Sequence, residues 1–174
     1  MSDAQRAGRV VLTLILAVYG LSILRHPDMG SLMDNVDLPI HETGHLVFSP
    51  FGDFMQFLGG TLFQIIVPGA FVAYFLKRKD RHAASVALWW IAQNFWNISV
   101  YVKDARNQDL DLVGGGEHDW AYLLGELGWL KRDQIIAHRV WTVGVAIYLV
   151  AIIGGLIVAM RARSAGETAE TVSA

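Results

Sequence analysis

The chain has 174 residues, enough for one domain, and it is 53% hydrophobic but only 17% charged. Soluble domains are usually less apolar and more charged, so this composition favours a protein that folds in a lipid bilayer. The sequence has no cysteine, which excludes disulfides, thiolate ligands and cysteine nucleophiles. It also has no basic nucleic-acid motif and no Gly-rich phosphate loop, so we expect no nucleic-acid partner.

Four stretches of the sequence contain no Asp, Glu, Lys or Arg. They are residues 10–24, 54–76, 83–102 and 141–160. A bilayer core of about 30 Å needs roughly 17 to 25 helical residues. Three of the stretches reach this length, and the first reaches it if Gly8 extends it while Arg9 and Arg25 snorkel to the headgroups. We therefore predict an all-α, polytopic membrane protein with about four transmembrane helices.

The loops predict how these helices are oriented. Four spans put both termini on one side, and the cation density of the short loops, led by KRKDR at residues 77–81, places that side in the cytoplasm of a bacterial-type inner membrane. Segments 41–45 and 109–124 then share the outer face and can meet at one membrane depth. We expect a single transmembrane helical domain over residues 1–163 and a disordered polar tail over residues 164–174.

A short motif lies between the first two stretches, in the segment DLPIHETGHLVF (residues 37–48). Asp37 is expected to cap a helix that holds Pro39 in its first turn. Helical periodicity then puts His41 and His45 on one face, where two imidazoles can bind one zinc ion. In this HExxH arrangement Glu42 is not a ligand but the general base that takes a proton from water. The segment is too short to span, which predicts a re-entrant or interfacial helix.

A hydrolytic zinc site also needs a third protein ligand and an open fourth position. His118 is the first candidate, because the three glycines before it permit unusual backbone angles and a close approach to the metal. Asp119 is the alternative, either as the ligand itself or as a carboxylate that orients an imidazole. His26 and His138 are weaker candidates, since a lone histidine near a helix end is more often a surface or packing residue. The segment GGGEHDW can also be a flexible loop before an interfacial helix.

Polar residues interrupt the apolar sequence of the third helix. They are Gln93, Asn94, Asn97, Tyr101 and Asp104, and the last four fall on one helical face. Polar side chains at this depth should face another helix, water or a bound peptide. They can surround the metal and hold a substrate strand, or they can form interhelical hydrogen bonds to Thr61 or Gln64. Gly44 and the GGT at residues 59–61 predict surfaces where helices approach closely.

A HExxH motif beside the membrane, followed by the Gly-rich helix FLGGTLFQIIVPG and a helix with polar residues, resembles the site-2 protease group of intramembrane zinc metalloproteases. The resemblance covers roughly residues 34–120. It implies that His41, His45 and an aspartate on a later helix bind Zn²⁺, and that Glu42 activates water. The aspartate–glycine signature of that family is absent, and GGGEHDW stands in its place. The resemblance thus implies a divergent or separate type of membrane metalloprotease, acting on membrane or juxtamembrane peptides.

Other functions fit the same residues. One is a metal-binding but non-catalytic membrane protein, such as an accessory subunit, and another is a structural membrane protein with no metal. His41 and His45 also form the HxxxH pattern of di-iron desaturases and hydroxylases. Those enzymes need more than the six histidines of this chain, and no HxxHH is present.

Overall fold

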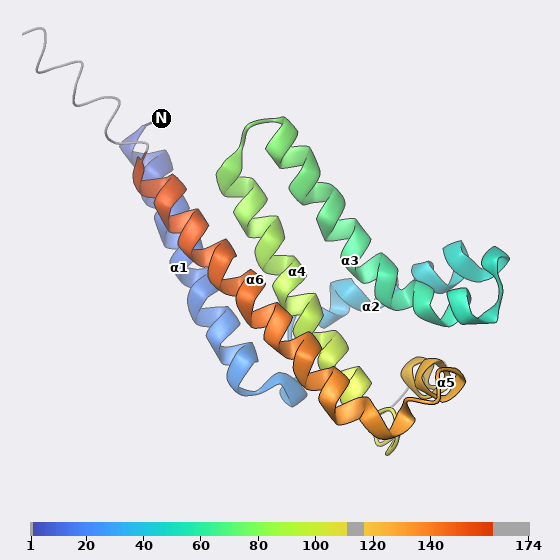
Figure 1. Cartoon of the computed structure of the whole chain (residues 1–174). Helices are drawn as coiled ribbons and strands as arrows, with labels where there is room; N and C mark the ends of the chain where they lie inside the picture. Colours follow the sequence, from blue (N-terminus) through green and yellow to red (C-terminus); the bar gives the residue numbers. More distant parts are fainter. Residues whose placement is uncertain (1, 111–116, 162–174) are drawn as a thin grey trace, which may run out of the picture.

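The computed structural model describes residues 2–110 and 117–161, and all regular elements in these residues are helical (Figure 1). The α-helices are α1 (Asp3–Arg25), α2 (Asp34–Phe48), α3 (Asp53–Lys77), α4 (Arg81–Lys103), α5 (Asp119–Glu126) and α6 (Asp133–Arg161). Short 3-10 turns precede α2, α3 and α6, at Pro27–Met29, Ser49–Phe51 and Leu130–Arg132. The all-α class is confirmed for this part of the chain. The predicted polar tail, residues 164–174, and the glycines at 114–116 lie outside the described residues.

Three segments are long and apolar enough to cross a membrane: α1, α3 and Leu130–Arg161, which contains α6. They contain three of the four predicted stretches. The fourth stretch lies in α4, which has 23 residues like α1 but carries Gln93, Asn94 and Asn97 within its apolar sequence. At 1.5 Å per residue α4 is about 34 Å long, enough for a bilayer core. A count of four spans stays a prediction.

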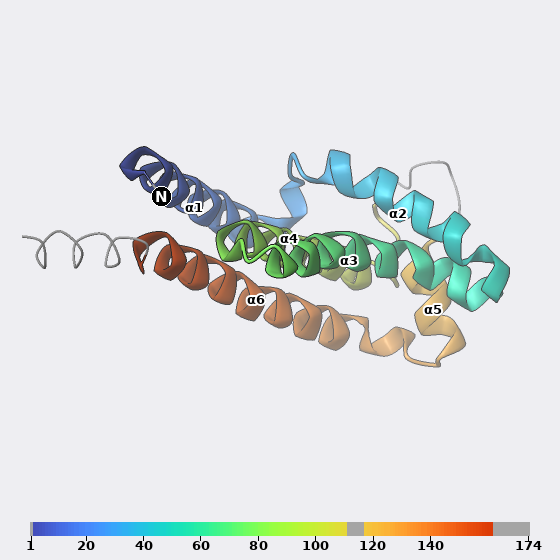
Figure 2. The same cartoon turned by 90° about the horizontal axis from the view of Figure 1, so that it is seen from above.

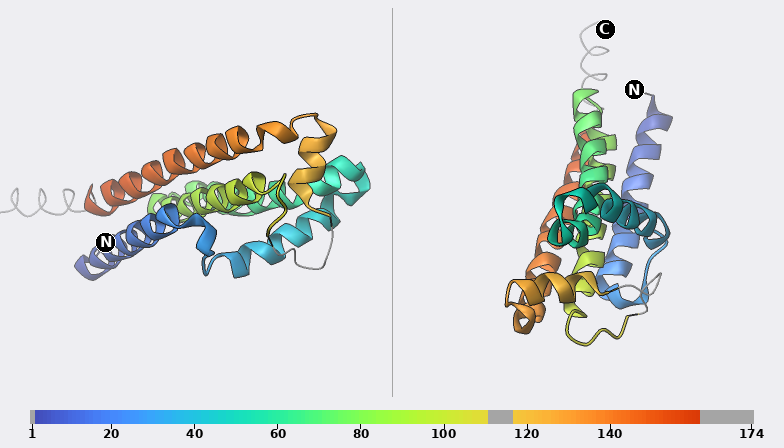
Figure 3. Two further views of the ribbon diagram at one scale, coloured as in Figure 1. Left: turned by 90° about the horizontal axis from the view of Figure 1, so that it is seen from below. Right: turned by 90° about the vertical axis from the view of Figure 1, so that its right-hand side faces the viewer.

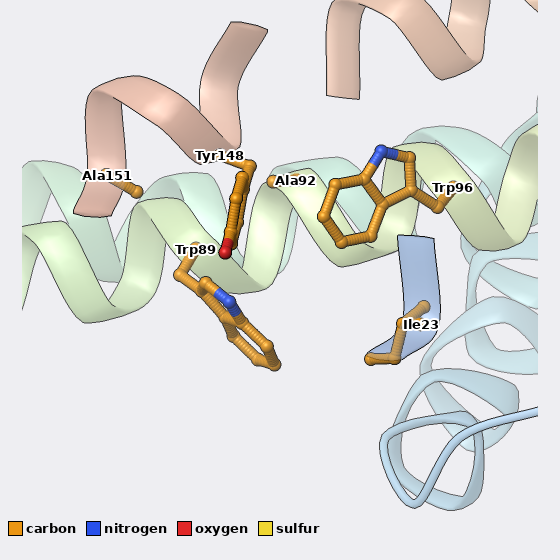
Figure 4. Close-up of a cluster of buried hydrophobic side chains, with 6 residues drawn as sticks. All are labelled: Ile23, Trp89, Ala92, Trp96, Tyr148 and Ala151. Carbon is orange, nitrogen blue, oxygen red and sulfur yellow. The ribbon is translucent and has the colours of Figure 1, made fainter. Parts of the chain in front are cut away.

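The central helix of the bundle is α4, which contacts α1, α3 and α6 and has more buried residues than the other described helices. A cluster of buried side chains joins it to α1 and α6 (Figure 4). The cluster consists of Ile23, Trp89, Ala92, Trp96, Tyr148 and Ala151. The Tyr148 hydroxyl also donates a hydrogen bond to the Ala17 carbonyl over 2.7 Å, which ties α6 to α1. Gln93 and Asn94 of α4 are buried as well, so this part of its polar sequence lies inside the bundle.

A second cluster holds α5 against the bundle. Its buried members are Ile98, Val102, Ala105, Leu124 and Ala137. Beside it the Arg106 guanidinium contacts the buried Asp133 carboxylate over 2.7 Å, linking the residues after α4 to the start of α6. These contacts fix the position of α5 relative to α4.

The two ends of the bundle differ. The start of α1, the turn between α3 and α4, and the end of α6 lie at one end, while α5 and the hairpin of α2 and the start of α3 lie toward the other (Figures 1, 2 and 3). Segments 41–45 and 109–124 were expected to share one face, and their described residues do meet there, with His41 in contact with Asp119. Which face of a membrane this end occupies stays a prediction.

Glycines allow α2 and α3 to approach closely. A Cβ atom at Gly59 would lie 2.7 Å from the Gly44 carbonyl oxygen and 2.6 Å from the Phe48 Cβ, closer than real Cβ atoms come to other atoms. A side chain at either glycine would therefore push the helices apart. The two predicted close-packing surfaces, Gly44 and the GGT segment, prove to pack on each other, and this contact places the motif histidines directly against α3.

The predicted start of α2 at Asp37 is wrong, because the helix begins one turn earlier, at Asp34. The Asp34 carboxylate accepts hydrogen bonds from the Ser31 backbone N–H, over 2.6 Å, and from the Ser31 hydroxyl, over 3.0 Å. Asp37 is buried and accepts a hydrogen bond from Trp90 Nε1 over 2.8 Å. Pro39 therefore lies inside the helix, where it has no N–H to donate to the carbonyl of the preceding turn.

Candidate metal centre

Three side chains from two distant segments converge between α2 and α5. His41, His45 and Asp119 each offer one ligand atom, and these atoms all lie within 4.8 Å of one another. The Asp119 Oδ2 is 2.9 Å from His41 Nε2 and 3.4 Å from His45 Nε2. The two imidazoles lie edge to face, with ring centroids 4.7 Å apart. Two nitrogens and one carboxylate oxygen at this spacing could hold a metal ion.

Charge favours a cation at this group. Burial alone would raise the pKa of Asp119, but hydrogen bonds from His41 and His45 outweigh it and hold the pKa below its usual value. The hydrogen bond to Asp119 raises the pKa of His45 to about 9, against the opposing effect of burial. Asp119 is therefore ionised at neutral pH, with its negative charge directed at the two Nε2 atoms.

The opposite nitrogen of each imidazole is held by an acceptor on α3. His41 Nδ1 lies 2.8 Å from Gln64 Oε1, and His45 Nδ1 lies 2.8 Å from the Gln56 carbonyl oxygen. A carbonyl oxygen can only accept, so each Nδ1 carries a proton and donates it. A metal ion would replace the proton that each Nε2 donates to Asp119, which makes Nε2 the candidate ligand atom on both rings, in the arrangement that protein metal sites use to orient histidine.

Asp119 is placed by its position in the first turn of α5. Its backbone N–H donates a hydrogen bond to the Tyr101 hydroxyl on α4 over 3.2 Å. Further along α5, Leu123 and Leu124 are almost completely buried. The apolar face of α5 therefore packs on the bundle while its first turn faces α2, with the Asp119 carboxylate between the motif histidines.

His118, the first candidate for third ligand, is not part of this group. It is the N-cap residue of α5, where Nδ1 accepts a hydrogen bond from the Ala121 N–H over 3.2 Å. Its Nε2 faces Asp104 at 3.4 Å without forming a hydrogen bond. Burial lowers the pKa of this imidazole. The imidazole therefore caps α5 and packs against Tyr101, with ring centroids 4.2 Å apart, and its nitrogens do not face the motif histidines.

The remaining histidines do not join the group either. His26 ends α1, and the exposed His138 stacks on Trp141 with ring centroids 5.9 Å apart. The Nε2 of His82 lies 3.0 Å from the Thr13 hydroxyl on α1, away from the candidate ligands.

A cavity of about 680 Å³ opens beside the three candidate ligands. Its walls come from α2, α3, α4 and the start of α5, and Tyr101 and Glu42 are among the lining residues. The Glu42 side chain is exposed, in contrast to the neighbouring His41, which is buried. A carboxylate next to the candidate metal centre and open to the cavity is free to contact water or a substrate.

The polar stripe of α4 forms interhelical hydrogen bonds at this cavity. Gln64 donates to Asn97 Oδ1 over 3.1 Å, and Asn97 donates in turn to Asp34 Oδ1 over 3.2 Å. The predicted hydrogen bonding between this stripe and Gln64 is confirmed. The contact of Gln64 with His41 was not foreseen. One signal was available in the sequence, since Gln64 follows Gly60 by one helical turn and therefore lies on the face of α3 that packs on α2.

No family model, no curated protein and no solved structure matches this chain. Any function must therefore be argued from the chemistry of the site.

The contact between Gly60 and His41 gives a first test of this geometry. A Cβ atom at Gly60 would lie 2.5 Å from His41 Nε2, so Gly60→Ala must displace a ring that Gln64 and Asp119 hold in place. We expect Gly60→Ala to weaken zinc binding at least about 10-fold, as changes beside metal ligands do. Gly69→Ala on the same helix is the control, because nothing lies within 4 Å of its Cβ position. Equal zinc affinity of the two variants would contradict this geometry.

The hydrogen bond to His41 gives a second test. Gln64→Ala removes the acceptor of His41 Nδ1, and loss of such an acceptor typically costs about 10- to 100-fold in metal affinity. Gln56→Ala is the matched control, because Gln56 holds His45 through its backbone carbonyl, which the substitution keeps. Competition with a fluorescent zinc chelator measures both affinities. The assignment fails if the two substitutions weaken binding equally.

Proposed function

We propose that this chain is a membrane-embedded zinc metalloprotease that hydrolyses peptide bonds of membrane or juxtamembrane substrates. The single observation that carries the proposal is the group of His41, His45 and Asp119, with the general-base candidate Glu42 beside it at an open cavity. Three protein ligands of nitrogen and oxygen type, with access for water, are what catalytic zinc sites use.

Each residue has a role in this proposal. His41, His45 and Asp119 would hold the ion, which polarises a substrate carbonyl and lowers the pKa of a water molecule when bound. Glu42 would accept a proton from a water molecule while the oxygen of that water adds to the carbonyl carbon of the substrate. The same carboxyl group would then give the proton to the amide nitrogen as the C–N bond breaks. The products are a carboxylic acid and an amine.

Two further features support a protease that acts at the membrane. Three helices are long and apolar enough to cross a bilayer, and the candidate ligands lie toward one end of the bundle. The resemblance to site-2 proteases implies two motif histidines and an aspartate from a later helix, a role that Asp119 fits by its position in α5. Because the aspartate–glycine signature is missing, we propose a separate type rather than membership of that family.

Product analysis tests the activity. The purified protein, reconstituted in lipid vesicles with one equivalent of zinc, is incubated with a mixture of synthetic transmembrane-segment peptides. Mass spectrometry should find pairs of fragments whose masses add up to one peptide plus one water. The fragments should disappear with 1,10-phenanthroline and return with added Zn²⁺. Fragments that form equally well in the chelator would show that another activity produces them.

A further inference from the structure

The face of α2 that carries the candidate ligands also carries two carboxylates. Asp34, Asp37, His41 and His45 follow one another at intervals of three or four residues, and all four line the cavity. At 1.5 Å per residue, Asp37 lies about 6 Å and Asp34 about 10 Å along the helix axis from His41. The cavity thus has a metal-binding end and a second, acidic end.

Asp34 is held in place by hydrogen bonds. Its carboxylate accepts hydrogen bonds from the Ser31 N–H and hydroxyl and from Asn97 Nδ2, and Gln93 Nε2 lies 3.4 Å from Oδ1. Donors on two sides therefore fix the carboxylate at the cavity wall, where a positively charged group can approach it.

Asp37 has an unused acceptor. The side chain is only 1% exposed, and its Oδ1 accepts the Trp90 N–H, but its Oδ2 has no hydrogen-bond partner. Leaving a buried carboxylate oxygen without a partner is costly. Burial raises the pKa of Asp37, and the nearby Asp34 charge acts in the same direction. A positively charged donor at Oδ2 would supply the missing partner.

The charge of the whole cavity also favours the binding of a cation. Its lining includes five acidic residues: Asp34, Asp37, Glu42, Glu117 and Asp119. Among the described lining residues there is no Lys or Arg. A divalent ion at the metal centre would offset only two of these charges, so the acidic end would still attract a cation.

We propose that Asp34 and Asp37 bind the ammonium or guanidinium group of a basic side chain on the substrate, close to the peptide bond that is cut. This inference rests on the proposed function and adds a substrate class to it. A span of roughly 6–10 Å from His41 suits a lysine or arginine side chain that starts next to the scissile bond. A cavity of about 680 Å³ has room for such a side chain and the adjoining peptide, far more than a bare inorganic ion needs.

Peptide binding to a zinc-loaded Glu42→Gln protein tests this inference without requiring turnover. The probes are acetyl-Leu-Lys-Leu amide and the same peptide with norleucine in place of lysine, titrated calorimetrically in detergent. We expect the lysine peptide to bind at least about 10-fold more tightly, a difference of about 1.4 kcal/mol. Adding Asp34→Asn or Asp37→Asn should remove this preference, whereas Glu126→Gln, an exposed acid outside the cavity lining, should keep it.

The other possible results contradict either the basic-side-chain site or the proposed function. Equal binding of the two peptides, or a preference that survives both Asp variants, contradicts the basic-side-chain site. If Ca²⁺ or Na⁺ titrated without peptide binds there and blocks the lysine peptide, the site is one for an inorganic cation and the inference fails. Selective binding without any hydrolysis by the wild-type protein would contradict the proposed function alone. Zinc content and melting temperature confirm that each variant is folded, and the two Asp variants provide independent tests.

Discussion

Replacing Glu42 by Gln is expected to abolish peptide hydrolysis while the protein keeps one zinc ion per chain. The amide cannot accept a proton from water, and a general base contributes about 10²- to 10⁴-fold to such reactions. The side chain is exposed at the cavity and is not one of the three candidate ligands, so folding and zinc content should not change. Turnover of a fluorogenic peptide and elemental analysis of the same preparation measure both quantities.

Glu126→Gln is the control, because Glu126 is an exposed acid outside the cavity lining and outside the group of candidate ligands. Its turnover should stay within a few-fold of wild type. If Glu42→Gln instead retains full activity, Glu42 is not the base. A wild-type protein that binds zinc stoichiometrically but cuts no peptide would favour the non-catalytic alternative, a metal-binding accessory or structural membrane protein.

Asp119→Ala is expected to lose zinc, whereas His118→Ala keeps it. Asp119 Oδ2 lies within 3.4 Å of both motif imidazoles, so its loss removes one of three ligands. We expect zinc affinity to fall by more than about 100-fold, because even the loss of a residue that only supports a ligand can lower metal affinity by about 100-fold. His118→Ala removes the N-cap of α5, which costs about 1 kcal/mol of stability, and also the buried ring that packs on Tyr101, but none of the three candidate ligands.

A third variant separates capping from metal binding at this position. His118→Asn keeps an N-cap acceptor without an imidazole, so it should restore the part of the melting temperature that the cap contributes, with zinc affinity unchanged in both His118 variants. A loss of zinc in His118→Asn, together with its retention in Asp119→Ala, would reverse the assignment of the third ligand.

Much of the helical framework follows from residue patterns. Uncharged apolar stretches predict α1, α3 and α6, because a charged side chain that faces lipid is energetically costly. The close approach of α2 and α3 follows from Gly44 and Gly59, because small residues let backbones meet. The histidine spacing correctly places His41 and His45 on one face of a short helix.

The sequence alone does not decide between His118 and Asp119 as the third candidate ligand, because the two residues are adjacent and both residue types can bind zinc. What separates them is the start of α5: the residue before the helix caps it, and the next one points from its first turn. Where that helix begins depends on how Leu124 packs on Ile98 and Val102 of α4 and on Ala137 of α6, which is a tertiary contact. The early start of α2 also reflects a tertiary contact. The Asp37 carboxylate accepts a hydrogen bond from Trp90 on α4 instead of capping the backbone of its own helix.

X-ray absorption at the zinc edge of the wild-type protein, purified without chelators or a histidine tag, tests the central claim most directly. We predict one zinc per chain bound by two imidazole nitrogens at about 2.0–2.1 Å and by oxygen ligands at about 2.0–2.2 Å. The Asp119→Ala protein should lose this signal. A spectrum that requires three imidazoles, or a wild-type protein that holds no zinc, would contradict a centre made of His41, His45 and Asp119.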